Sequence, residues 1–132
     1  MSAISNYLEN KLLNALLDAQ PYPTHSTVWL ALFDATQDLE ANSFSGEISA
    51  SGYARQIVNF GTASGGEISN SQAVTFTPTG TWTGIRAIAV VTAAGGVQGN
   101  GEILFWTLIS TLTAQSGVDL VINPGELKVR LN

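Results

Sequence analysis

Beyond residue 26, every strong periodic signal in the sequence belongs to a short β-strand, and turn residues separate each strand from the next. Apolar and β-branched residues recur with a period of two or in short unbroken runs. The predicted strands are Thr27–Phe33, Tyr53–Phe60, Ala73–Thr77, Ile85–Thr92, Glu102–Thr107, Val118–Ile122 and Glu126–Leu131. Short strands at intervals of about ten residues predict a mainly β fold, an antiparallel β-sandwich or barrel of jelly-roll-like form.

Some of these segments can be placed within the sheets. Thr27–Phe33 is apolar on both faces, which is typical of a strand inside a sheet. Ile85–Thr92 and Glu102–Thr107 are predicted to pair as a hairpin across a glycine-rich connection. Pro124-Gly125 matches a type II turn and predicts a closing hairpin. Residues 34–52 form a long polar loop with no strand pattern.

The residues before this β region contain the one predicted helix, from residue 4 to residue 18. Its apolar side chains recur every three or four residues and include Ile4, Leu8, Leu12, Leu13, Ala15, Leu16 and Leu17. Ser2 or Ser5 caps its start, and the prolines at 21 and 23 end it because proline cannot continue the hydrogen-bond ladder. Such a helix either covers its own sheet or inserts into a neighbouring subunit. No linker interrupts the sequence, so residues 1–132 are predicted to form a single domain, with the β region at 27–132.

Composition excludes several classes of protein. Ten acidic and five basic residues give a net charge of -5, so no clustered basic face is available for nucleic acid. Charged residues make up 11%, well below the usual ~25%, and the surface is therefore expected to be polar but mostly neutral. The absence of cysteine excludes disulfides, thiol catalysis and thiolate metal sites. The sequence shows neither a signal peptide nor an apolar run of about 20 residues, so synthesis in the cytoplasm without membrane insertion is expected.

The sequence contains no recognisable catalytic or metal-binding pattern. His25 is the one imidazole, and it lies in a polar turn with no nucleophile or orienting acid at a suggestive spacing. Asp34, Asp38 and Glu40 form the densest acidic cluster, but they lack the regular alternation and the glycine of a calcium loop. The glycine-rich runs 61–66 and 95–101 lack a lysine and a following helix, so they are interpreted as hairpin turns rather than phosphate loops. We therefore expect a protein that is not an enzyme and that uses no cofactor.

The three tryptophans divide into two groups. Trp29 and Trp106 lie within predicted strands, where packing in the core is the common outcome. Trp82 lies among Thr and Gly between predicted strands, so either a core position or a surface and interface role is open for it. With Tyr53 it would form a stacking platform if the protein were a carbohydrate-binding module.

Several blocks, in the same order along nearly the whole chain, carry a resemblance to a known family. They are the opening residues 1–17, Val28–Phe33, Ser51–Phe60, Ala63–Asn70, Val74–Phe76, Trp82 and the Pro124-Gly125 turn. The most specific is the Gly-Tyr-Ala-Arg-Gln sequence within Ser51–Phe60. The sequence resembles a family of small structural proteins of tailed bacteriophages that are often labelled tail-fibre-like.

This resemblance implies a non-enzymatic component of the virion and supplies no catalytic residue. The favoured interpretation is a capsid cement or decoration protein, a homo-oligomer that binds the major capsid protein or other virion subunits. The alternative is a tail or tail-fibre component that acts in host adsorption, and a carbohydrate-binding module is a lesser one. The expected interaction patch comprises Tyr7, Leu8 and Lys11 of the helix, Trp82 and the 34–52 loop.

Overall fold

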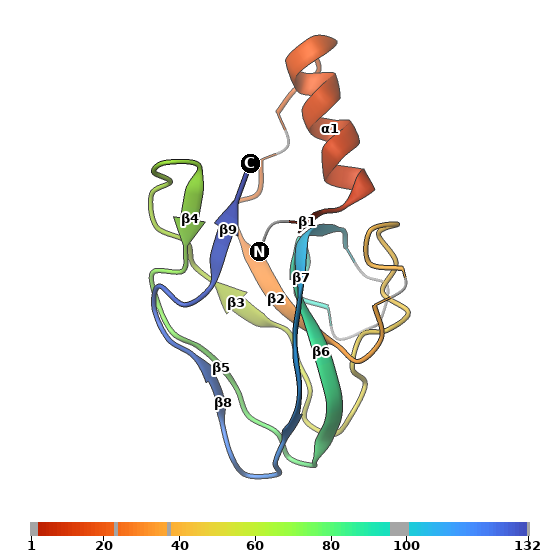
Figure 1. Ribbon diagram of the computed structural model, residues 1–132, viewed down its shortest axis with the longest axis vertical. Helices are drawn as coiled ribbons and strands as arrows, with labels where there is room; N and C mark the ends of the chain where they lie inside the picture. Colours follow the sequence, from red (N-terminus) through yellow and green to blue (C-terminus); the bar gives the residue numbers. More distant parts are fainter. Residues whose placement is uncertain (1–2, 23, 37, 96–100, 132) are drawn as a thin grey trace.

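One five-stranded antiparallel sheet organises the fold (Figure 1). The computed structural model describes residues 3–22, 24–36, 38–95 and 101–131. Its elements are β1 (Ala3–Ile4), α1 (Asn6–Leu17), β2 (Val28–Phe33), β3 (Gln56–Val58), β4 (Glu67–Ser69), β5 (Val74–Phe76), β6 (Trp82–Val91), β7 (Ile103–Ala114), β8 (Leu120–Ile122) and β9 (Lys128–Arg130). The large sheet has the order β1-β7-β6-β2-β3, and the pairs β4-β9 and β5-β8 form a second layer. The predicted mainly β fold with one N-terminal helix is confirmed, and the two layers form a sandwich-like arrangement.

The strand β2 lies inside the large sheet, between β6 and β3, as its sequence predicts. Successive side chains of a strand point to opposite faces, and those of β2 are apolar on both. Leu30 and Leu32 belong to a core cluster that also contains residues of β5 and β9. Ala31 and Phe33 belong to a second cluster, with Leu39 and other side chains. Both faces of the sheet are therefore covered around β2.

Trp82 lies in the first of these cores, at the start of β6. Its side chain is 1% exposed, and its ring meets those of Tyr53 and Phe76 edge-on, with centroids 5.6 and 6.4 Å away. Its indole N–H donates to the Ser51 carbonyl over 2.8 Å. The surface position considered for Trp82 is therefore wrong, and so is a stacking platform on the surface. The strand starts three residues before the predicted Ile85 and continues through an irregularity in pairing.

The end of the chain does not form the predicted closing hairpin. β8 pairs with β5 and β9 pairs with β4, so the turn at Pro124-Gly125 carries the chain from one pair to the other. Buried Asn70 anchors this turn. Its side-chain amide donates to the Asn123 carbonyl over 3.0 Å, and its side-chain oxygen accepts from the Leu127 N–H over 2.9 Å. A short-range turn pattern could not reveal this long-range anchor.

The second face of the large sheet is covered by the 34–52 loop. Leu39 and Phe44 of the loop are buried against it, and the rings of Phe44 and Phe33 lie 6.3 Å apart. Asn42 adopts φ +64°, a conformation that asparagine tolerates better than most residues, and its side-chain oxygen accepts from the Ile103 N–H over 2.6 Å. A segment predicted as a polar loop is thus part of the second core.

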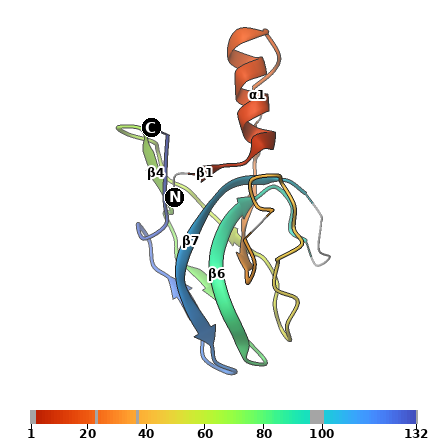
Figure 2. The same cartoon turned by 45° about the vertical axis from the view of Figure 1, so that its right-hand side comes forward.

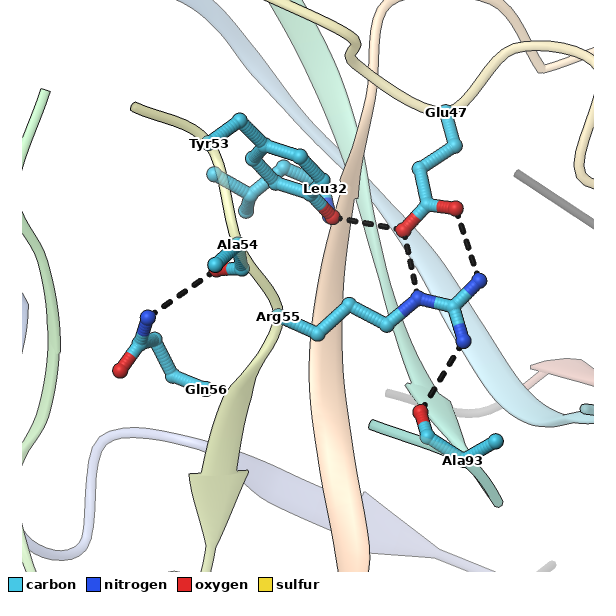
Figure 3. Close-up of polar contacts among 7 residues, drawn as sticks. All are labelled: Leu32, Glu47, Tyr53, Ala54, Arg55, Gln56 and Ala93. Atoms are coloured by element: carbon cyan, nitrogen blue, oxygen red, sulfur yellow. Dashed lines mark hydrogen bonds and ion pairs between the residues drawn. The ribbon is translucent and has the colours of Figure 1, made fainter. Parts of the chain in front are cut away.

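A buried ion pair fixes the end of this loop (Figure 3). The Arg55 guanidinium donates to both carboxylate oxygens of Glu47, each over 2.7 Å, and to the Ala93 carbonyl over 3.0 Å. It also lies 4.6 Å from the ring centre of Phe44. The Tyr53 hydroxyl donates to Glu47 over 2.7 Å and accepts from the Leu32 N–H over 3.1 Å. Burial, and then the nearby Glu47 charge, raise the pKa of Tyr53, so its hydroxyl stays protonated as a donor.

The Gly-Tyr-Ala-Arg-Gln block therefore has a structural role. Gly52 adopts φ +78° with its α-carbon so close to Thr79 that a side chain would collide there. Tyr53 and Arg55 then reach Glu47 from the same segment.

Several other strand boundaries differ from the predicted ones. The Tyr53–Phe60 segment contains only the three-residue β3, whereas β7 runs to Ala114, seven residues past the predicted end. β4 was not predicted as a strand, because its three residues carry too little periodicity. The predicted helix start at residue 4 is wrong, since Ile4 belongs to β1 and α1 runs from Asn6 to Leu17. The 61–66 run turns a hairpin, with Gly65 and Gly66 at positive φ, as predicted. Most of the 95–101 run lies outside the described residues.

We predict that Arg55→Met lowers the free energy of unfolding by about 3–5 kcal/mol, because it leaves Glu47 buried without its charged partner. The double variant Glu47→Leu, Arg55→Met removes both charges and is expected to lose less. Denaturant titration measures both. The matched control is Arg130→Met, since Arg130 binds Glu67 at the surface, where solvent screens an ion pair and it contributes little to stability. Equal losses in Arg55→Met and Arg130→Met would contradict a dominant role for the buried pair.

Candidate interaction surface on the N-terminal helix

A joint at Ser5 fixes the direction in which α1 leaves the sheets. Ser5 follows β1 directly, is fully buried and forms the N-cap of the helix. Its hydroxyl accepts from the Leu8 N–H over 3.3 Å and donates to the Ile103 carbonyl in β7. The next N–H, that of Asn6, donates to the Glu40 carbonyl over 2.9 Å. Of the two caps that the sequence allowed, the structure uses Ser5. The bonds of Ser5 and Asn6 together tie the start of the helix to β7 and to the 34–52 loop.

Beyond this joint, α1 projects away from the two layers (Figures 1 and 2). Leu8 is its buried residue, and Leu12 packs half-buried against the core. Leu13, Leu16 and Leu17 are 55, 62 and 81% exposed. These three leucines, here called the apolar stripe, are spaced by three and four residues and so share one side of the helix. Of the two alternatives that the sequence left open for the helix, covering of its own sheet therefore does not hold for its last two turns.

The chain folds back along another side of α1. Both the Asp18 and the Gln20 N–H groups donate to the Asn14 carbonyl, and Ala19 between them adopts φ +53°. A left-handed residue at this place reverses the chain after a helix. Residues 20–22 and 24–25 then lie beside the helix and close a pocket against it.

This helix pocket has a volume of about 410 Å³, within the usual range for ligand sites. Its lining consists of Tyr7, Lys11, Asn14, Asp18, Gln20, Pro21, Tyr22, Thr24 and His25. The helical members are spaced by four and three residues, so they share a side of α1 that differs from the apolar stripe. The Lys11 ammonium lies 5.8 Å from the ring centre of Tyr7. In the described part of the chain, the side chains of Lys11, Asn14, Asp18 and His25 form no hydrogen bond.

The lining residues offer ring faces and hydrogen-bonding groups to a ligand. His25 shares the pocket with an acid, an amine and two phenols, and no serine or threonine of the described residues is hydrogen-bonded to it. Among the described residues, no three His, Cys, Asp or Glu side chains gather closely enough to hold a metal ion. Asp38 instead accepts from the Ser45 hydroxyl over 3.2 Å. None of the described helices has the length and apolar character to cross a membrane.

Comparison with known families assigns the chain. A family model described as podophage GP4 fiber I protein gp80 matches residues 3–130. The chain belongs to this fiber I family. No curated protein matches the sequence. The predicted resemblance to small structural proteins of tailed phages is thereby confirmed, and the chain is a protein of a phage fibre family.

The structure brings together part of the interaction patch that the sequence predicted for this family member. Tyr7 and Lys11 line the helix pocket, whereas Leu8 is buried at the foot of α1. Trp82 is in the core, and the 34–52 loop covers its own sheet. That any of these residues forms an interface stays a prediction.

The structure adds the exposed leucines and His25 to the residues that the sequence predicted for the interaction patch. Leu13 and Leu16 were predicted as helical apolar residues, and the helical spacing already placed them on one side of α1. Their exposure depends on the direction that Ser5 gives the helix. His25 reaches the pocket because the chain reverses after α1, and no local pattern indicates that reversal.

We predict that Ser5→Ala lowers the free energy of unfolding by about 1–2 kcal/mol, because it removes the N-cap and the bond to β7. The helix signal in circular dichroism should fall, and protection from hydrogen exchange should fall more in α1 than in β6. Ser110→Ala is the control, since Ser110 is exposed in β7. If Ser5→Ala behaves like Ser110→Ala, the joint is not anchored through this hydroxyl.

Proposed function

We propose that this protein is a component of a tail fibre of a podophage virion and takes part in adsorption to the host cell. The observation that carries the proposal is the family match over nearly the whole chain, because that family is described as a fibre protein. Capsid decoration was the favoured interpretation of the sequence, but the family description supports the tail alternative. A non-enzymatic role agrees with the binding character of the helix pocket.

The arrangement of the chain fits a fibre component in a specific way. The two β layers form a packed body, and α1 extends from it with unpartnered apolar side chains among the described residues (Figure 2). Large exposed leucines on one helix side are typical of a surface that another subunit covers. Association with other virion subunits would then use α1 and leave most of the body accessible.

The helix pocket favours a second, related function, which is recognition of a saccharide on the host surface. Two tyrosines, Tyr7 and Tyr22, offer ring faces, and Tyr22 is 61% exposed at the rim. Lys11, Asn14 and Asp18 add donors and acceptors that no described residue occupies. Apolar ring faces together with uncommitted polar groups match the chemistry of sugar rings, which carry C–H faces and hydroxyl edges.

The tail placement predicts where the protein lies on the virion. We expect gold-labelled antibodies against it to decorate the tail and not the head in electron micrographs. Mass spectrometry of purified particles should give far fewer copies of it than of the major capsid subunit. Phage lacking the protein should adsorb poorly while their heads withstand heating and osmotic shock as usual. Labelling over the whole head, or heads that break without the protein, would support capsid decoration instead.

The saccharide function predicts a loss of binding without a loss of stability. Tyr22→Ala should weaken binding of polysaccharide released from the host envelope by roughly tenfold, the effect of one stacking contact. Tyr22→Phe keeps the ring and should bind almost normally. The control is Ile57→Ala, an exposed apolar residue of β3 away from the pocket. Isothermal titration measures binding, and equal affinities in Tyr22→Ala and Ile57→Ala would remove the pocket from consideration.

A further inference from the structure

A second cavity meets the helix pocket at His25. This cavity, here called the interlayer cleft, has a volume of about 410 Å³ and lies between the large sheet and the pair β4-β9. Apart from His25, its described lining is apolar and comes from β2, β4, β6, β7, β9 and Phe60. Val90, Leu104 and Val129 of this lining are 3, 6 and 5% exposed, so the cleft reaches the core. β4 and β9 lie toward the end of the body from which α1 projects (Figures 1 and 2).

The two cavities that meet at His25 differ in chemistry. The helix pocket presents the rings of two tyrosines and several polar side chains, among them Lys11 and Asp18. The interlayer cleft presents aliphatic and aromatic side chains, and His25 is its one polar side chain among the described residues. Because both linings include His25, a molecule seated in the helix pocket lies beside the mouth of the cleft. A ligand with a polar head and an apolar extension fits the two cavities together.

The lining of the interlayer cleft also indicates which kind of apolar group can enter it. A polypeptide segment would carry backbone N–H and C=O groups into the cleft, and these groups are unfavourable to bury without a partner. Among the described lining side chains, the His25 imidazole is the one hydrogen-bonding partner on offer. An alkyl chain has no hydrogen-bonding group, so it can fill the cleft without leaving such a group unpaired. The cleft therefore suits a lipid chain better than an inserted segment of another protein.

Another apolar cleft among the described residues lacks this connection to the helix pocket. This distal cleft has a volume of about 390 Å³ and is lined mainly by aliphatic residues, among them Ile109, Leu112 and Leu120 of β7 and β8. Its described lining shares no residue with that of the helix pocket. A chain attached to a ligand in the helix pocket would thus reach the interlayer cleft first, and the distal cleft provides an internal comparison.

We infer that the helix pocket and the interlayer cleft together bind a glycolipid, which is a saccharide that carries an alkyl or acyl chain. The saccharide lies against the tyrosines of the helix pocket, and the chain passes His25 into the space between the layers. Burial of each methylene group raises affinity by up to about fourfold, so the chain supplies much of the affinity. This inference rests on the saccharide function proposed above and names the class of saccharide that the site prefers.

The first measurement is the affinity of the full chain for alkyl glucosides from methyl to octyl, at concentrations below micelle formation. Isothermal titration should show a gain of about two- to fourfold per methylene until the cleft is full. Octyl glucoside should therefore bind even where methyl glucoside binds too weakly to measure. Equal affinities along the series, or no binding of octyl glucoside, would overturn the inference. If released polysaccharide still binds in that case, the saccharide function stands without the lipid chain.

The contribution of the saccharide is tested on the same series. Tyr22→Ala should lower the affinity for every glucoside by a similar factor, because Tyr22 contacts the sugar and not the chain. The gain per methylene should stay as in the wild type. An affinity for octyl glucoside that Tyr22→Ala leaves unchanged would mean that the helix pocket holds no saccharide, and this result would overturn the inference.

A pair of variants locates the chain. Ile68→Trp fills the interlayer cleft and should remove the gain from chain length. Ile122→Trp in the distal cleft is the matched control, because both isoleucines are partly buried in three-residue strands of the second layer. Denaturant titration shows whether each variant folds. Equal effects of the two variants, or a larger effect of Ile122→Trp, would overturn the inference.

A further measurement locates the chain without a variant. Amide chemical shifts that differ between the octyl and methyl glucoside complexes should lie at Ile68, Phe105 and Val129, which line the interlayer cleft. They should be absent at Leu120 and Ile122 of the distal cleft. The opposite distribution would assign the chain to the distal cleft and overturn the inference, even if Ile68→Trp fails to fold. Labelling of the virion tail tests the placement in the fibre separately.

Discussion

The pairing of Glu47 with Arg55 is the contact on which the remaining architecture depends. It joins the end of the 34–52 loop to the segment that leads into β3, and through the Ala93 carbonyl it reaches the end of β6. Burying either charge without its partner would be unfavourable. The three segments are therefore held in the one arrangement that keeps the guanidinium, the carboxylate and the Ala93 carbonyl in contact. Phe44, which packs under the guanidinium, belongs to the loop that covers the second face of the sheet. The contacts that hold the loop in position are therefore the same ones that keep the second face of the sheet covered.

The same loop also determines where the helix points. Glu40 accepts from the first N–H of α1, and Asn42 accepts from the N–H of Ile103, whose own carbonyl receives the Ser5 hydroxyl. The buried ion pair and the helix joint are therefore linked through a few residues of one loop. A helix held in this way at one end needs no sheet beneath it to keep its direction. Because α1 is anchored only at its first turn, the apolar stripe in its last two turns stays exposed to solvent.

Local patterns predicted most elements of the fold, and their failures have a common cause. The interior strand β2, the hairpin of β6 and β7 and the turn at Gly65-Gly66 follow from periodicity and from residues that favour turns. The position of Trp82 stayed open because its environment is set by Tyr53 and Phe76, which are not its neighbours in the sequence. The closing turn was misassigned because Asn70 anchors it from more than 50 residues away. For the candidate site, spacing identified the helix with Tyr7 and Lys11, but exposure of the stripe and the arrival of His25 depend on how the chain enters and leaves that helix.

The two sides of α1 impose different requirements on a fibre component, and the structure meets them with one element. An apolar surface loses its exposure when another subunit covers it, so it suits contact with a neighbouring subunit. A pocket lined by tyrosines, and by polar side chains that form no hydrogen bond within the described residues, can bind a ligand only while solvent and ligand can enter. Had the pocket shared the side of the stripe, assembly would have closed it. The residues of α1 that line the pocket lie on a different side of the helix from Leu13, Leu16 and Leu17. A subunit that covered the leucines would therefore leave the pocket open and would stabilise the helix that forms one of its walls. Assembly would then strengthen ligand binding, because it removes fraying of that wall before the ligand arrives.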